Sequence, residues 1–173
     1  MDDESTTGTK AGLPRRLAAL FYDLLLVIAL AFVATFAMLP LTGGEAISTS
    51  TQGVVGHLYH AVLVLAVFAY FGWCWTRGGQ TLGMKAWRIR LEPADGRRLN
   101  WSDALVRFVL GAATAWMAML GVRYLLEPGG PLRTAGAVAM LAPLVANFAW
   151  IPFDSAGRSL MDLAVRSCVV RCG

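Results

Sequence analysis

The sequence predicts an all-α integral membrane protein with four transmembrane helices, and three observations support this prediction. The chain has 173 residues, of which 57% are hydrophobic and only 15% are charged, whereas soluble domains usually have about 25% charged residues. The mean hydropathy is +0.57. The apolar residues also form long blocks instead of short periodic stretches. The charged residues are therefore too few to cover a soluble surface.

Four apolar blocks reach the length of about 20 residues that a helix needs to cross a bilayer. The first is too long for the core of a signal peptide and is interrupted by Asp23, so we expect an uncleaved span. We expect a flexible leader over residues 1–13 and a single transmembrane domain over residues 14–173. The predicted spans cover residues 16–39, 57–76, 102–122 and 134–153.

The positive residues predict the orientation of these spans. Twelve of the fifteen Lys and Arg residues lie in the N-terminal segment, in loop 77–101 and in the C-terminal tail. Loop 40–56 has none, and loop 123–133 has only Arg123 and Arg133. Because positive loops stay on the cytoplasmic side, we expect both termini and loop 77–101 to be cytoplasmic. Charge arranged in this way sets membrane topology, so no nucleic-acid partner is expected.

Loop 77–101 contains a stretch with a period of two residues. Trp87, Ile89 and Leu91 alternate with charged residues, and turn-forming residues "PADG" follow. We predict a cytoplasmic β-hairpin that pairs residues 87–92 with residues 97–100, its apolar face toward membrane or protein. The opposite face would meet anionic lipid headgroups or a partner protein; the alternative is a solvated loop that only sets topology. That basic face comprises Arg88, Arg90, Arg97 and Arg98.

The C-terminal tail has apolar residues at positions 160, 163, 164 and 168. This spacing predicts an amphipathic helix, which would lie along the membrane interface or dock under the bundle. Its acidic residue, Asp162, faces a strongly basic rim. We predict that Asp162 lies at the cytoplasmic surface, within reach of Arg16 or of an arginine from loop 77–101.

Asp23 is the unusual residue of the first span, because a carboxylate near the middle of a membrane helix costs about 2.5–3.5 kcal/mol on insertion scales. Arg16 is seven residues earlier, and its side chain is expected to point toward the N-terminus and the headgroups. Asp23 therefore needs a partner from another helix.

One polar residue in each of the other spans lies at a similar depth. Tyr70, Arg107 and Asn147 are five to seven residues from the cytoplasmic ends of their helices, or about 8–10 Å at 1.5 Å per residue. We predict that Arg107 and Asn147 donate hydrogen bonds to Asp23, with Tyr70 nearby. A local pair of Arg107 with Asp103, four residues earlier, is the alternative, and the two arrangements can coexist.

Other reactive residue types do not form a recognisable site. His57 and His60 stand at the outer mouth of the second span, where they suit interface anchoring better than proton sensing or metal binding. The three cysteines have no metal-binding spacing. No Ser/His/Asp or Cys/His arrangement appears, so we expect no enzyme, no metal and no cofactor.

The combined motifs resemble the RDD family of bacterial membrane proteins, named for one Arg and two Asp. The matching residues are Arg16 in "PRRLAAL", Asp23 in "LFYDLLL" and Asp162 in "GRSLMDLAV". "GGQTLGMKAWRIRL" resembles the family's loop after the second helix, with Leu82 where a Pro is usual. In the tail, Arg166 and Ser167 replace the usual Gly-Thr.

The resemblance implies a multi-pass protein of the bacterial cytoplasmic (inner) membrane and a small secondary transporter. Cation–proton exchange is the most concrete activity, with Asp23 alternating between a proton and a monovalent cation. Four short spans would require a homo-oligomer for this task. The alternative is a membrane scaffold that transports nothing and binds lipids or partner proteins, in which Asp23 is structural.

Overall fold

The computed structural model describes residues 9–42, 54–94, 96–127 and 130–172. The chain is mostly helical, with a small antiparallel sheet of two strands. In chain order the elements are α1 (Leu13–Met38), a 3₁₀ turn η1 (Leu39–Thr42), α2 (Val54–Arg77), α3 (Leu82–Ala86), β1 (Ile89–Pro93), α4 (Trp101–Leu126), α5 (Pro131–Ala149), α6 (Leu160–Ala164) and β2 (Ser167–Arg171).

Four helices, α1, α2, α4 and α5, are long and apolar enough to cross a membrane, as predicted. Their most apolar windows have mean hydropathies between 1.4 and 2.5, yet only 6–11% of each window is buried. Most of their apolar surface therefore faces outward, where a bilayer would cover it. Helices α1 and α5 each have a proline in the first turn. Proline is tolerated there because the N–H groups of a helix's first turn have no acceptor within the helix.

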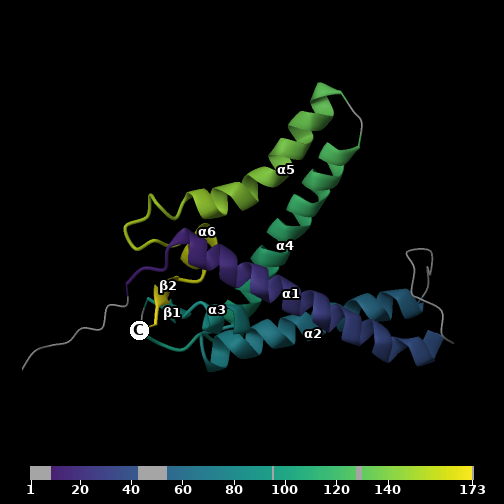
Figure 1. Cartoon of the computed structure of the whole chain (residues 1–173), viewed down its shortest axis with the longest axis horizontal. Coiled ribbons are helices and arrows are strands. Elements are labelled where there is room, and N and C mark those ends of the chain that lie inside the picture. Colours follow the sequence, from purple (N-terminus) through teal and green to yellow (C-terminus); the bar gives the residue numbers. More distant parts are fainter. Residues whose placement is uncertain (1–8, 43–53, 95, 128–129, 173) are drawn as a thin grey trace, which may run out of the picture.

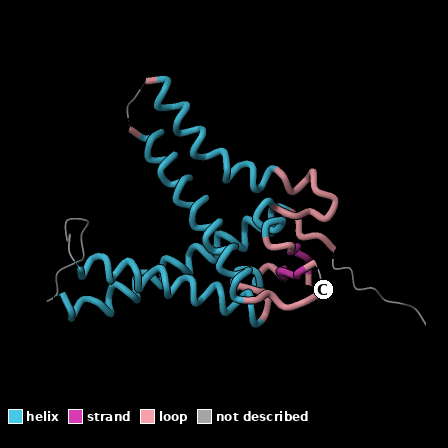
Figure 2. Tube along the Cα trace, turned by 180° about the vertical axis from the view of Figure 1, so that it is seen from behind, coloured by secondary structure: helices cyan, strands magenta, loops and turns pink. Residues whose placement is uncertain are grey.

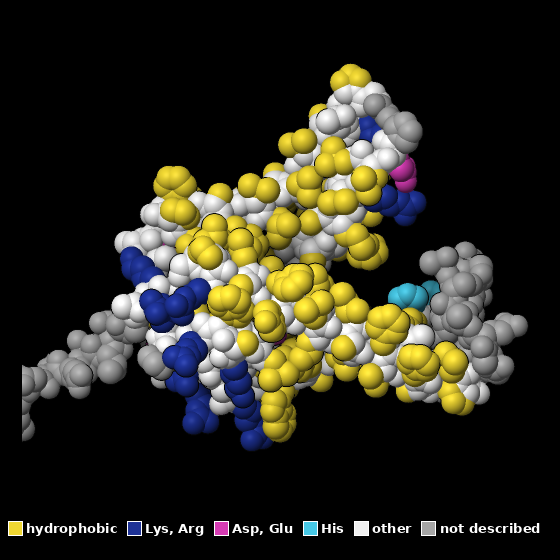
Figure 3. Space-filling model, viewed as in Figure 1, with side chains coloured by type: hydrophobic (Ala, Val, Ile, Leu, Met, Phe, Trp, Pro, Cys, Tyr) yellow, Lys and Arg dark blue, Asp and Glu magenta, His cyan; other side chains and the backbone are white. Residues whose placement is uncertain are grey.

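The four long helices form two diverging arms (Figures 1 and 2). In one arm α1 and α2 run side by side, and in the other α4 and α5 do so. The arms meet at one end, where the short elements α3, β1, α6 and β2 lie; we call this end the base. On the face shown in Figure 3, hydrophobic side chains cover the arms and most Lys and Arg side chains gather around the base.

The sheet in the base differs from the predicted hairpin. β1 pairs antiparallel with β2 near the C-terminus, with Ile89 opposite Arg171 and Pro93 opposite Ser167. Residues 97–100 form no strand, because Leu99 is buried in the core and the Asn100 side chain accepts from the Asp103 N–H to cap α4. The prediction of β1 and its buried face is confirmed, since Ile89 and Leu91 are each 2% exposed. The prediction of its partner strand was wrong.

The tail also differs from the predicted continuous amphipathic helix. It folds into the short helix α6, and then Arg166, at a φ of 49°, turns the chain into β2. Val169 of this strand is buried and packs with Ile89 and Leu91 in the core of the base. The tail therefore docks under the arms as a helix and a strand.

The N-terminal segment is held to the base over its last residues. Lys10 bridges to Val170 of β2, and the Ala11 N–H donates to the Val169 carbonyl at 3.1 Å. Ala11 is 2% exposed. The first eight residues of the predicted leader lie outside the described residues.

Candidate functional site

Asp23 is bound by the start of α3. Its Oδ2 accepts from the Thr81 hydroxyl at 2.5 Å, and its Oδ1 accepts from the Gly83 N–H at 3.0 Å. Thr81 Oγ1 in turn accepts from the Met84 N–H and so caps the helix. Asp23 is only 6% exposed. Through these two hydrogen bonds Asp23 ties the span α1 to the base.

The glycines of the loop "GGQTLG" permit this contact. A Cβ on Gly83 would lie 2.2 Å from the Ala19 carbonyl oxygen and 2.9 Å from Cγ of Asp23, so only glycine lets α3 approach α1 this closely. Gly79 has a φ of +63° and lies against the backbone of Leu91. The loop is therefore shaped to deliver two hydrogen-bond donors to Asp23.

Asp162 is bound by an arginine from each arm. Arg16 Nη1 of α1 donates to Oδ2 at 2.7 Å, and Arg107 Nη1 of α4 donates to Oδ1 at 2.7 Å. Asp162 Oδ2 also accepts from the Ser159 N–H, and the Ser159 hydroxyl accepts from the Asp162 N–H. This reciprocal pair is a capping box at the start of α6. One carboxylate therefore joins both arms to the tail.

The predicted contact between Asp162 and Arg16 is thus confirmed, but two details of the prediction were wrong. The Asp162 side chain is 0% exposed instead of lying at a surface. Arg16 does not reach toward headgroups: it is 8% exposed, and it also donates to the carbonyls of Ala11 and Gly157. The folded tail surrounds both side chains, which a helix lying along the interface would not do.

The electrostatics of Asp162 favour its charged form. Burial alone would raise the pKa of this carboxyl, but the charges of Arg107 and Arg16, with the hydrogen bonds from Ser159 and Arg16, outweigh burial and hold the pKa below its ordinary value. Nearby, the hydrogen bonds from Arg158 lower the pKa of Asp154 to about 2. Asp162 and Asp154 therefore remain ionised at neutral pH.

We expect the base to loosen in acid. A carboxyl whose pKa is lower in the folded state stabilises the fold above its unfolded pKa, near 4, and loses this contribution as the pH falls through the folded pKa. In thermal unfolding in detergent, the difference between wild type and Asp162→Asn should be constant from about pH 8 to 5. It should shrink as the pH falls from about 4 toward 2. A difference that stays constant down to pH 2 would contradict the assignment.

The four residues predicted to cluster have other partners. Arg107 pairs with Asp162 and not with Asp23 or Asp103. The Asn147 Oδ1 accepts from the Met161 N–H at 3.0 Å, and the Tyr70 hydroxyl accepts from the Leu82 N–H at 3.1 Å. The predicted hydrogen bonds to Asp23 were therefore wrong, because the base supplies the partners and the diverging arms separate the groups.

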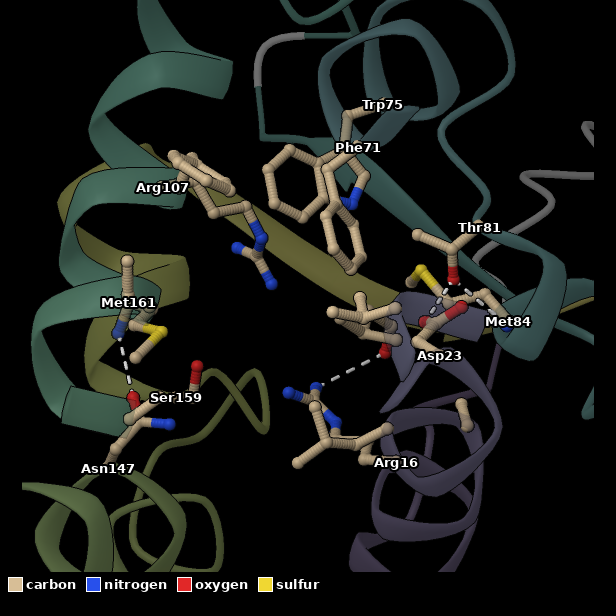
Figure 4. A pocket seen from close by; sticks show the side chains of 18 of the residues that line it. Arg16, Asp23, Phe71, Trp75, Thr81, Met84, Arg107, Asn147, Ser159 and Met161 are labelled. Carbon is tan, nitrogen blue, oxygen red and sulfur yellow. Dashed lines mark hydrogen bonds between the residues drawn. The ribbon is translucent and has the colours of Figure 1, made fainter. Parts of the chain in front are cut away.

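Three of these residues nevertheless line one cavity. It has a volume of about 460 Å³ and lies where all four long helices contribute side chains. Asp23, Arg107 and Asn147 border it, as do Arg16 and Ser159, while its remaining walls are largely apolar. In Figure 4, Asp23 and Thr81 lie on one side of the cavity, and Arg107, Asn147 and Ser159 lie on the other. The cavity is the site in this chain where polar groups and an apolar wall converge.

A comparison with known families identifies the chain. The profile of the RDD family matches residues 10–166. The protein belongs to the RDD family. A search of curated proteins gave no match. The match covers the four spans and the base up to β2, and thus includes Arg16, Asp23 and Asp162.

Arg16, Asp23 and Asp162, which were expected to form the family motif, therefore hold the base to the arms in this chain. The residues that bind Asp23 and Asp162, namely Thr81, Gly83 and Ser159, were not predicted from the sequence. For Thr81 and Ser159 the sequence did contain a helix-capping pattern. Thr81 precedes a short apolar helix as an N-cap does, and Ser159 stands three residues before Asp162, the spacing of a capping box.

The predicted basic surface is exposed beside the base. Arg88 and Arg90 flank the buried Ile89, and Arg97 and Arg98 follow the turn after β1. Trp87 is 37% exposed at the same edge. Among the residues that the structure describes, no group of three His, Cys, Asp or Glu side chains gathers as metal ligands would.

Proposed function

We propose that this RDD protein binds an amphiphilic ligand inside the membrane, in the cavity between its arms. The observation that carries the proposal is the cavity itself, which is bordered by guanidinium, amide and hydroxyl groups at the base and by apolar walls along the spans. Such a mixed lining suits a ligand with a polar head and an apolar chain. The ion pair of Asp162 and the contact of Asp23 with α3 keep the cavity in shape.

In this proposal the base faces the cytoplasm, as the distribution of Lys and Arg favours. The chain then lies in the bacterial cytoplasmic membrane with both termini inside. The exposed basic residues of the base and Trp87 meet anionic headgroups. A ligand would enter the cavity from the cytoplasmic leaflet.

The substitution Gly111→Leu is expected to remove ligand binding. Gly111 lines the cavity, and a Cβ added there meets no atom within 4 Å, so a larger side chain occupies ligand space without a clash. Native mass spectrometry of the detergent-purified protein should show retained lipid in the wild type and a loss of at least about tenfold in the variant.

The matched control is Gly136→Leu, which places the same side chain on α5 outside the cavity lining, again at a glycine with no atom within 4 Å of a Cβ. This variant should retain lipid like the wild type. Equal retention by all three proteins would refute a ligand site in the cavity.

Cation–proton exchange is the second candidate, and one observation favours it: the Asp23 carboxylate borders the same cavity. An exchanger must let this carboxylate alternate between a proton and a monovalent cation. A four-span exchanger of this kind would act as a homo-oligomer. Two observations favour the binding function instead. Both Asp23 oxygens already accept hydrogen bonds, and two guanidinium groups, those of Arg16 and Arg107, border the cavity and repel cations.

The substitution Asp23→Asn separates these candidates. An Asn keeps one acceptor oxygen for the Gly83 N–H, but its amide nitrogen can only donate to the Thr81 hydroxyl, which already accepts from the Met84 N–H. The Thr81 hydroxyl hydrogen then loses its acceptor, and such a loss costs about 1–3 kcal/mol. We therefore expect a lower free energy of unfolding and a lower folded yield in detergent. Proton flux driven by a cation gradient in proteoliposomes should be absent in wild type and variant alike. Normal yield with flux lost only in the variant would establish exchange.

A further inference from the structure

Three side chains at one side of the cavity have hydrogen-bond donors with no protein acceptor among the described residues. Arg107 uses Nη1 for Asp162, which leaves Nε and Nη2. Asn147 is 5% exposed and uses only its Oδ1, which leaves both hydrogens of its amide nitrogen. The Ser159 hydroxyl accepts from Asp162, which leaves its own hydrogen. All three side chains line the cavity, so a molecule bound there could accept from them.

These donors come from three elements and meet at one place. Arg107 belongs to α4, Asn147 to α5, and Ser159 caps α6. Figure 4 shows their side chains together on the side of the cavity opposite Asp23. A group with several acceptor oxygens could accept hydrogen bonds from all three side chains. A phosphate presents such oxygens close together.

The local charge favours an anion. Two guanidinium groups, Arg16 and Arg107, share the single carboxylate of Asp162, so this group of three carries one net positive charge. Asp23 lies across the cavity and is bound by its own donors on α3. An anion beside Arg107 would lie against this positive group, on the side of the cavity away from Asp23.

The apolar part of the cavity follows α4 away from the base. Gly111, Ala112 and Ala115 line it one to two turns beyond Arg107, or about 6–12 Å along the helix axis. Their small side chains leave a groove that Val27 and Val67 face from the other arm. An acyl chain that starts at these donors could lie along this groove and run toward the centre of the membrane.

We propose that the cavity binds a phospholipid with an anionic headgroup, its phosphate on Arg107, Asn147 and Ser159 and one acyl chain along Gly111 and Ala115. The proposal rests on the ligand-binding function proposed above and adds the class of ligand. It predicts selectivity by headgroup charge, which a merely apolar cavity would not show.

The test is a lipid titration followed by native mass spectrometry. Purified protein is titrated with phosphatidylglycerol or with phosphatidylcholine of the same acyl chains. Both headgroups carry the phosphate, but the choline cation of phosphatidylcholine would lie beside the net positive group of Arg16, Arg107 and Asp162. The wild type should therefore bind phosphatidylglycerol at least about tenfold more tightly. Equal affinities of the wild type for the two lipids would overturn the proposal while leaving a lipid-binding cavity in place. Binding of neither lipid would overturn the binding function as well.

The variant Asn147→Asp tests the donors directly. The aspartate keeps an oxygen for the Met161 N–H but replaces two donor hydrogens with a negative oxygen. Phosphatidylglycerol affinity should fall by at least about tenfold and phosphatidylcholine affinity should fall less, because the new negative charge repels the shared phosphate but attracts the choline cation. An unchanged preference for phosphatidylglycerol in a folded variant would contradict the placement of the phosphate.

Inorganic phosphate provides the last arm of the test. Excess phosphate should leave phosphatidylglycerol binding unchanged, because the acyl chain supplies much of the affinity. Displacement of the lipid by phosphate, together with equal phosphate binding to Gly111→Leu, would show a site for the free anion and would refute the lipid proposal.

Discussion

The substitution Asp162→Asn is expected to lower the free energy of unfolding by about 3–5 kcal/mol, the usual cost of removing one partner from a buried ion pair. The Asp162 side chain is 0% exposed, and the side chains of Arg16 and Arg107 are 7% and 14% exposed. Without the carboxylate, two arginines remain nearly buried with no counter-charge. The loss can be measured by titration with sodium dodecyl sulfate in mixed micelles.

Glu127 provides a matched control for this experiment. Its carboxylate also bridges two arginines, Arg123 and Arg133, but its side chain is 45% exposed. Ion pairs exposed to solvent contribute little to stability, so Glu127→Gln should unfold close to the wild type. Equal effects of the two substitutions would show that the ion pair of Asp162 does not hold the base to the arms.

The substitution Gly83→Ala is expected to separate α3 from α1. The new methyl group would lie 2.2 Å from the Ala19 carbonyl oxygen, a contact that two backbones cannot absorb without moving apart. Overpacking of this kind costs about 1–3 kcal/mol, and a shift of α3 would also weaken both hydrogen bonds to Asp23. Hydrogen exchange of the amides at the start of α3 should rise along with the loss of stability.

Gly111→Ala is the control for the loss at Gly83. A Cβ at Gly111 meets no atom within 4 Å, and alanine favours a helix over glycine. This variant should be as stable as the wild type or slightly more stable. A Gly83→Ala protein with normal stability and normal exchange would mean that α3 does not need this close approach to α1.

Much of the fold was predictable because the dominant signals are local. A span shows itself by its length and hydropathy, and all four predicted blocks correspond to helices. The period of two around Ile89 and Leu91 located β1 for the same reason. The partner of β1 was not predictable in this way, since β2 lies more than seventy residues later in the chain. Nothing local distinguishes it from a continuation of α6 except the β-branched Val169 and Val170.

The site was predicted only in part, for a related reason. Counting residues along each helix put Asp23, Arg107 and Asn147 at a similar depth, and all three border the cavity. It could not give their partners, because these come from α3 and α6, which enter the base between the arms. Residue depth is a property of one helix, whereas the pairing of polar groups depends on how the loops fold back.

A structure of the protein in nanodiscs that contain phosphatidylglycerol would show directly whether a lipid occupies the cavity. We expect a lipid headgroup there, with phosphate oxygens within hydrogen-bonding distance of Arg107 and Asn147 and an acyl chain beside Gly111. A cavity closed by the movement of the two arms, or filled by a helix from a second copy of the chain, would contradict it.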